Sequence, residues 1–423
     1  GKFMSCGCFR DSLHYSSPSH GDWGVVRIGM LLPQSVQLFI CCSGCGRHGA
    51  LSAIHQGYKD RLFYLYLDQS DIVSGYDDLI PEAVDEILSR LEKRPRAMLL
   101  FVSCLDDLIG TNHEAVLEEL RRRHPEIRFA FAHMNPITLN EALSPPVSIQ
   151  KNLYAMLDAP KEKDGGIGCI GNLERISDRS ELYFLIRSTG GKLRHISEYT
   201  SFDDFQEMAA CKKNLLLFPP GRAAARDLQE RLGTEFLFLP ATYDLEEIAE
   251  NYRRLEEFLA CKWKAEAKQC LEESRKRAEN EMEETREALG DYPIIVDDTA
   301  TIQPFGLALT LLKRGFHVVR VEADACTPFD RAHLEELKEN YPKVESFQPI
   351  HSSSVAMDRP LPESLALGFE GGYLAGSKHV ADLFMDGGMF GYDGVISLMR
   401  SMREGMKKTG ALKSLIESKG LVV

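Results

Sequence analysis

The sequence predicts an α/β protein made of three Rossmann-like domains, each with a parallel sheet flanked by helices. The chain has 423 residues, which suggests about three domains at ~100–200 residues each. Short apolar runs alternate with longer amphipathic stretches, as is typical of βαβ units. The alternation repeats on the scale of a domain, with no short solenoid repeat.

Residues 1–158 are expected to form an N-terminal α/β domain. Its short apolar runs favour strands, and its stretches with apolar residues three or four apart favour helices. The expected strands are Val36–Ile40, Leu62–Leu67, Ala97–Val102 and Ile127–Ala132, and the expected helices are Asp77–Lys93 and His113–Arg123.

Residues 159–244 are expected to form a second α/β domain. The charged, glycine-containing stretch Ala159–Gly166 breaks the preceding pattern, which is why we place a boundary there. The expected strands are Ile167–Ile170, Leu193–Ser197, Asn214–Phe218 and Phe236–Pro240, and the expected helices are Arg179–Thr189, Phe202–Cys211 and Ala223–Leu232.

Residues 245–290 are expected to be connecting helices, because Leu245–Leu289 is highly charged and contains no proline. A single helix over this stretch would be about 68 Å long at ~1.5 Å per residue, longer than one domain. We therefore expect at least two helices that cross between domains. Residues 291–423 then form a third α/β domain with a C-terminal helix. Its expected strands are Ile294–Asp297, His317–Val321 and Ser364–Leu367, and its expected helices are Phe305–Arg314 and Gly391–Lys408.

The charge balance argues against two classes of partner. The chain has 50 Lys and Arg against 63 Asp and Glu, a net charge of −13. Nucleic acids and anionic membranes both require a basic surface, so neither is expected as a partner. No window of about 18 uncharged apolar residues is present, so no membrane-spanning helix is expected. No basic segment followed by an apolar run opens the chain, so no secretory signal is expected.

The eleven cysteines are the most informative residues. Their odd number, together with the expected absence of export, argues against a disulfide framework and predicts reduced thiols in the cytoplasm. Such thiols are either core residues or metal ligands. Those near the N-terminus are Cys6, Cys8, Cys41, Cys42 and Cys45, and Cys104 follows an expected strand.

Two cysteine-bearing turns, far apart in the sequence, each follow an expected parallel strand. Cys41–Gly49 comes after the first strand and Ser103–Gly110 after the third. Ligands bind beyond the carboxyl ends of parallel strands, so the two turns are expected at one sheet edge. Glycines beside Cys45 would let the backbone approach a cluster. The Cys42–Cys45 CxxC has no second pair, unlike a zinc ribbon. The spacing alone leaves a metal cluster, buried structural cysteines and a redox dithiol as alternatives.

Three motifs in order resemble component 1 of nitrogenase and its relatives, among them the dark-operative protochlorophyllide reductases, a nickel-tetrapyrrole reductive cyclase and methylthio-alkane reductase. Ser43–Gly46 is similar to the family's Gly-Cys-Gly turn. Cys104–Gly110 resembles its cysteine-bearing strand end, and Gly391–Gly394 resembles the Gly-Phe-Asp-Gly that opens its C-terminal helix. The order of three α/β units is also that of the family.

The resemblance implies that Cys45 and Cys104 ligate a [4Fe–4S] cluster, or a larger iron–sulfur cluster, at a subunit interface. It also implies an upstream ligand, for which Cys8 is our choice and Cys6 the substitute. The fourth ligand would come from the partner subunit or from Cys42 or Cys41.

Arg47 and His48 directly follow the cluster turn. They are candidates to donate hydrogen bonds to the cluster or to a substrate. The alternative role is to cap the next helix. The resemblance further implies an ATP-hydrolysing iron protein as electron donor, and a homodimer or a heterodimer with a component-1-like paralogue. No nucleotide is expected on this chain, because Gly368–Gly376 has neither the GxGxxG spacing nor a P-loop ending.

The sequence departs from nitrogenase where that enzyme holds its large cofactor. Phe218 stands where the cysteine ligand is expected, and Ala381–Phe390 contains no histidine. The iron–molybdenum cofactor site is therefore expected to be absent. We expect the iron–sulfur subunit of a nitrogenase-like reductase with an unidentified substrate. The alternatives are a scaffold for metal-cluster assembly and a non-catalytic partner of a paralogous subunit.

Overall fold

The structure is a computed structural model that describes residues 25–42, 61–102, 112–133, 144–349, 360–410 and 412–418. It contains three sheets flanked by helices, which confirms the predicted α/β class. The chain divides into two compact units. One comprises Asp22–Leu173 and Leu193–Phe238, and the other includes Glu174–Lys192 and the chain from Leu239 onward. No helix in the described ranges is long and apolar enough to span a bilayer.

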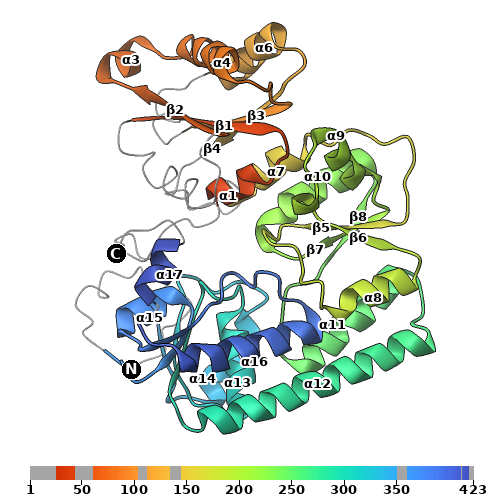
Figure 1. The fold of residues 1–423 in the computed structure, drawn as a ribbon, viewed down its shortest axis with the longest axis vertical. Helices are drawn as coiled ribbons and strands as arrows, with labels where there is room; N and C mark the ends of the chain where they lie inside the picture. The colour runs from red at the N-terminus through yellow and green to blue at the C-terminus, as the bar shows by residue number, and fades with distance from the viewer. Residues whose placement is uncertain are drawn as a thin grey trace. The chain divides into compact units, whose positions relative to one another are not determined.

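The first sheet has the strand order β2-β1-β3-β4, and all its neighbouring strands are parallel (Figure 1). Every residue of β3 is buried, as the uniformly apolar run predicts for a central strand. The strands are β1 (Ser35–Cys42), β2 (Leu62–Leu67), β3 (Ala97–Val102) and β4 (Arg128–His133). The helices of this region are α1 (Val25–Met30), α3 (Gln69–Ser74), α4 (Leu79–Arg90), α6 (His113–Arg123) and α7 (Pro145–Tyr154).

Alternation along β3 divides its side chains between two cores. Met98 and Leu100 pack in a cluster with Val84 of α4 and Leu120 of α6. Leu99 and Phe101 lie in the opposite cluster, which includes residues of α1, α7 and α10 (Arg222–Leu232). Successive side chains of a strand point to opposite faces, so a strand with helices on both sides must be apolar throughout.

The second sheet has the order β6-β5-β7-β8, and the β5–β7 and β7–β8 pairs are parallel. Its strands are β5 (Gly166–Ile170), β6 (Lys192–Arg194), β7 (Lys213–Leu216) and β8 (Glu235–Phe238). The helices are α9 (Phe202–Phe205) and α10 (Arg222–Leu232), with 3₁₀ turns η4 (Ile196–Glu198), η5 (Gln206–Ala210) and η6 (Pro219–Gly221).

Two predicted elements of this region change to 3₁₀ structure. The strand predicted at Leu193–Ser197 ends at Arg194, because the His195 side chain accepts a hydrogen bond from the Ser197 amide and starts a 3₁₀ turn. The helix predicted at Phe202–Cys211 is one α-helical turn followed by 3₁₀ structure.

The third sheet has the order β11-β10-β9-β12-β13, and all its neighbouring strands are parallel. Its strands are β9 (Ile294–Asp297), β10 (Val318–Glu322), β11 (Glu345–Phe347), β12 (Leu365–Leu367) and β13 (His379–Ala381). Its helices are α13 (Pro304–Lys313), α14 (Arg331–Asn340), α15 (Phe369–Ala375), α16 (Gly391–Lys407) and α17 (Leu412–Ser418).

The charged stretch before the third sheet contains two helices, α11 (Leu245–Phe258) and α12 (Ala265–Leu289), as its length predicted. Both belong to the same compact unit as α8 (Glu181–Ser188) and the third sheet. The long helix α12 packs along α16 (Figure 1). Ala278 and Met282 are buried on its inner face, and Glu281 forms an ion pair with Arg403 of α16 at 2.6 Å.

Candidate functional site

The two strands that precede the predicted cluster turns lie side by side. β1 and β3 are parallel neighbours, with Ile40 opposite Val102 in their register. Cys41 and Cys42 form the end of β1, opposite Tyr66 and Leu67 of β2. The carboxyl ends of β1 and β3 therefore lie on adjacent strands at the same edge of the sheet.

The predicted ligands themselves lie outside the described residues, with one exception. Cys6, Cys8, Cys45 and Cys104 belong to the segments that the structure does not describe, as do Arg47 and His48. The backbone of Cys42 is described as the last residue of β1.

The structure describes five further cysteines, and none of them belongs to a possible metal site among the described residues. Cys169 and Cys211 are buried, which is typical of core thiols. Burial raises the pKa of the Cys211 thiol to about 11, which keeps it protonated. Cys261, Cys270 and Cys326 are half-buried.

Two segments were compared with nitrogenase's cofactor site in the sequence analysis: Phe218 stands at the first, and the second, Ala381–Phe390, contains no histidine. β7 ends at Leu216, and Phe218 opens the 3₁₀ turn Pro219–Gly221. His379 precedes the histidine-free stretch Ala381–Phe390, and its Nδ1 lies 2.8 Å from the carbonyl oxygen of Lys408. The ring of His379 therefore binds the C-terminal end of α16.

The Gly-Tyr-Asp-Gly motif forms the first turn of α16, as the sequence predicted. The Glu181 carboxylate accepts hydrogen bonds from the backbone amides of Tyr392 and Asp393 and from the Tyr252 hydroxyl. Gly391 has a φ of +67°, and a Cβ at this position would overlap Glu181 and the Tyr252 hydroxyl. The glycine is therefore required by the local packing of the helix N-terminus.

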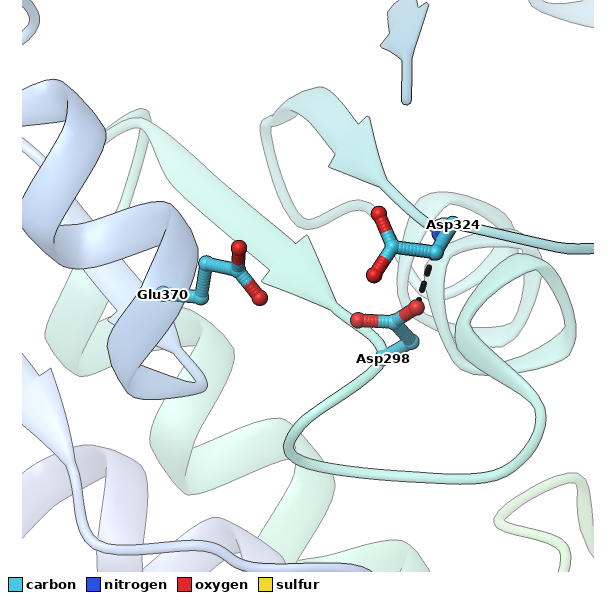
Figure 2. Close-up of side chains that lie close together, drawn as sticks. All are labelled: Asp298, Asp324 and Glu370. Atoms are coloured by element: carbon cyan, nitrogen blue, oxygen red, sulfur yellow. Dashed lines mark hydrogen bonds between the residues drawn. The ribbon is translucent and has the colours of Figure 1, made fainter. Parts of the chain in front are cut away.

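The structure also brings together carboxylates that the sequence analysis did not single out. Oxygen atoms of Asp298, Asp324 and Glu370 all lie within 4.8 Å of one another. Figure 2 shows Glu370 directed from α15 toward Asp298 and Asp324, which follow β9 and β10. The Asp324 amide donates a 2.8 Å hydrogen bond to Asp298 Oδ2.

Two further carboxylates, Asp297 and Glu322, are fully buried at the same strand ends. Asp297 accepts hydrogen bonds from the amides of Thr299 and Gly371, at 2.8 and 2.5 Å. Burial raises the pKa of Asp297 to about 7. Burial, reinforced by neighbouring carboxylates, raises the pKa values of Asp298 and Glu322 well above their usual range. We call these five residues the acidic cluster.

The chain matches the family model of nitrogenase component 1 type oxidoreductases over residues 22–407. Its fold is similar to the solved structure described as nitrogenase Cp1 at pH 6.5, with a TM-score of 0.71, 14% identity, and 94% of each chain covered. A second structure, nitrogenase Cp1 at pH 5, matches with a TM-score of 0.64 and 13% identity, covering 90% of this chain and 88% of that one. No curated protein matches the sequence. Because the family model covers nearly the whole chain, the protein belongs to the nitrogenase component 1 type oxidoreductases.

Proposed function

We propose that this chain is the iron–sulfur subunit of a nitrogenase-like reductase. Cys45, Cys104 and Cys8 would hold a [4Fe–4S] cluster, with Cys6 as the substitute for Cys8 and Cys42 as a candidate fourth ligand. The observation that carries this proposal is the adjacency of β1 and β3, from whose ends the segments with Cys45 and Cys104 depart.

The donor set fits an iron–sulfur cluster. Neighbouring strands lie about 4.8 Å apart, so the ends of β1 and β3 are close enough to face one cluster. Thiolates are the soft ligands that such clusters require, and a [4Fe–4S] cluster accepts and releases one electron at a time. The glycines flanking Cys45 allow backbone amides to approach cluster sulfur.

The proposed electron donor is a separate ATP-hydrolysing iron protein, the partner with which this family works. The chain has no P-loop sequence, which is consistent with ATP being hydrolysed on that partner. Arg47 and His48 are proposed to donate hydrogen bonds near the cluster. The acceptor of the electrons is an unidentified substrate. Dinitrogen reduction in the standard manner is not expected, because Phe218 cannot ligate an iron–molybdenum cofactor.

The phenylalanine at position 218, where a cofactor-ligating cysteine was expected, also supports a second candidate function. A subunit without cofactor ligands can act as a non-catalytic partner of a component-1-like paralogue, with which it would share the interface cluster. A scaffold that assembles a cluster without turnover is the third alternative. The first two functions require a dimer, either with a second copy of this chain or with the paralogue.

The test of the proposal is the metal content of the anaerobically purified chain. We expect iron and acid-labile sulfide in the ratio of a [4Fe–4S] cluster, with its broad visible absorbance. Cys45→Ala and Cys104→Ala should each lose most of the iron. Cys261→Ala is the matched control, because this half-buried thiol lies between α11 and α12. Iron-free wild-type protein, or full iron in Cys104→Ala, would contradict the proposal.

A further inference from the structure

The acidic cluster lies where three adjacent strands of the third sheet end. β10, β9 and β12 are consecutive in the sheet and parallel, so their carboxyl ends meet at one edge. Asp298 directly follows β9, Asp324 follows β10, and Glu370 lies in the first turn of α15, which follows β12. Ligands of open parallel sheets bind at this kind of edge. The arrangement is therefore in the right place for a binding site.

Glu322 provides a second, independent observation at this edge of the sheet. Its side chain is fully buried, and neither carboxylate oxygen accepts a hydrogen bond from any described residue. Arg320 Nη1 lies 3.9 Å from Glu322 Oε1, beyond hydrogen-bond distance. A Cβ at Gly371 would be 2.8 Å from Glu322 Oε2 and 3.0 Å from Asp297 Oδ2, so Glu322 points into the acidic cluster.

Burying several carboxylates close together is energetically unfavourable unless their negative charge is neutralised. A buried carboxylate without a partner is strongly disfavoured, and neighbouring carboxylates add repulsion. Protons or a bound cation can relieve such repulsion, and only a cation uses three oxygens that converge from separate elements.

The spacing of the oxygens suits a hard cation. Two ligands of the same ion cannot be farther apart than twice the bond length, which is about 4.6–5.2 Å for Ca²⁺ and about 4.0–4.2 Å for Mg²⁺. The oxygens of Asp298, Asp324 and Glu370 lie within 4.8 Å of one another. Asp298 and Asp324 are half-buried, so an ion can reach them, whereas Glu370 is buried beneath.

We propose that Asp298, Asp324 and Glu370 bind one divalent cation of the oxygen-preferring class, Ca²⁺ or Mg²⁺, at the carboxyl edge of the third sheet. Glu322 and Asp297 lie behind these ligands and add negative charge to the site. Three protein ligands leave further coordination positions, which water or an anionic group of a bound molecule can fill.

The test is titration of the full chain, freed of divalent ions on a chelating resin, with Ca²⁺ and separately with Mg²⁺. Calorimetry should detect one ion per chain, and the same ion should raise the thermal unfolding midpoint. Asp298→Asn combined with Asp324→Asn should weaken binding by at least about tenfold. The cation-free midpoint of this variant should be unchanged or higher, because the substitutions remove repulsion. Glu370→Gln provides a second, single-site variant.

Asp291→Asn is the matched control, because Asp291 is exposed and precedes β9 at the opposite end of the strand. It should bind the cation as the wild type does. The proposal is overturned if the wild type binds neither ion at millimolar concentration. It is equally overturned if the double variant and Glu370→Gln bind with wild-type affinity.

Discussion

The Glu181 carboxylate accepts a hydrogen bond from the backbone amide of Tyr392, at 2.5 Å, and so caps the N-terminus of α16. A second bond comes from the Asp393 amide at 3.2 Å. Glu181 is buried, so water cannot replace it as the acceptor for these amides. A negative charge at this end of a 17-residue helix also interacts favourably with the helix dipole.

Glu181→Ala should therefore lower the free energy of unfolding by about 1–3 kcal/mol, because two buried amides lose their acceptor. Glu181→Gln keeps an acceptor oxygen and should cost less. Urea unfolding curves measure both effects. Glu272→Ala, an exposed position on α12, serves as the control and should change little. Equal stability of Glu181→Ala and this control would show that the cap contributes nothing.

Gly391→Ala should be more destabilising than Gly376→Ala, although both glycines have a positive φ, +67° and +63°. The added methyl group has open space at position 376 and overlaps Glu181 and the Tyr252 hydroxyl at position 391. We expect about 1 kcal/mol for the backbone penalty at position 376. Gly391→Ala should add about 1–3 kcal/mol from overpacking. Thermal unfolding of the two variants tests this order, and the reverse order would refute the packing argument.

His333 should make stability depend on pH in the alkaline range. Its Nδ1 lies 2.8 Å from Asp330 Oδ1 and its Nε2 lies 2.5 Å from Glu247 Oε1. These hydrogen bonds, Asp330 first, raise the pKa of His333 to about 10. A raised histidine pKa stabilises the fold fully below about 6.5, and this contribution disappears as the pH rises toward 10.

The free energy of unfolding should therefore fall by about 2–4 kcal/mol between pH 6.5 and 10 because of this group. His333→Gln should be less stable at pH 6.5 and should show a flatter profile over this range. Asp330 also accepts hydrogen bonds from the Phe305 and Gly306 amides at the start of α13, so the variant reports on that helix as well. His317→Gln is the control. Parallel pH profiles for wild type and His333→Gln would contradict the prediction.

If the chain is the proposed reductase subunit, a reduced iron protein of the nitrogenase type should reduce its cluster only when ATP is hydrolysed. Loss of the oxidised absorbance after rapid mixing measures this step. A non-hydrolysable ATP analogue should give no reduction. Reduction at the same rate without nucleotide would contradict ATP-dependent electron transfer from an iron protein. That result would favour the alternative function, a scaffold for cluster assembly.

Local pattern predicted most of the strands and helices because each carries its own signal. The run Ala97–Val102 is apolar on both faces and forms the buried β3. The signal failed for short or glycine-rich segments, and the ten-residue helices α7 and α14 were also not predicted. β11 and β13 have three residues each, too few to show a period, and the glycines after Leu367 concealed the helix Phe369–Ala375.

The two candidate sites differ in how much of each could be predicted from the sequence. The turns with Cys45 and Cys104 stand out because cysteine beside glycine at a strand end is chemically distinctive. Asp298, Asp324 and Glu370 did not stand out, because single acidic residues after strands are common. What brings them together is the strand order β10-β9-β12, a long-range property of the sheet.

The sequence by itself determined the α/β class, most element positions, the acidic net charge and the cysteines that we propose as iron ligands, since these depend on residue type and local period. Only the tertiary structure decided that β1 and β3 are neighbours, that Glu181 caps a helix 211 residues away, and that five carboxylates share one sheet edge. The physical reason is that strand pairing and burial depend on contacts between distant segments, and no local pattern encodes which segments will meet.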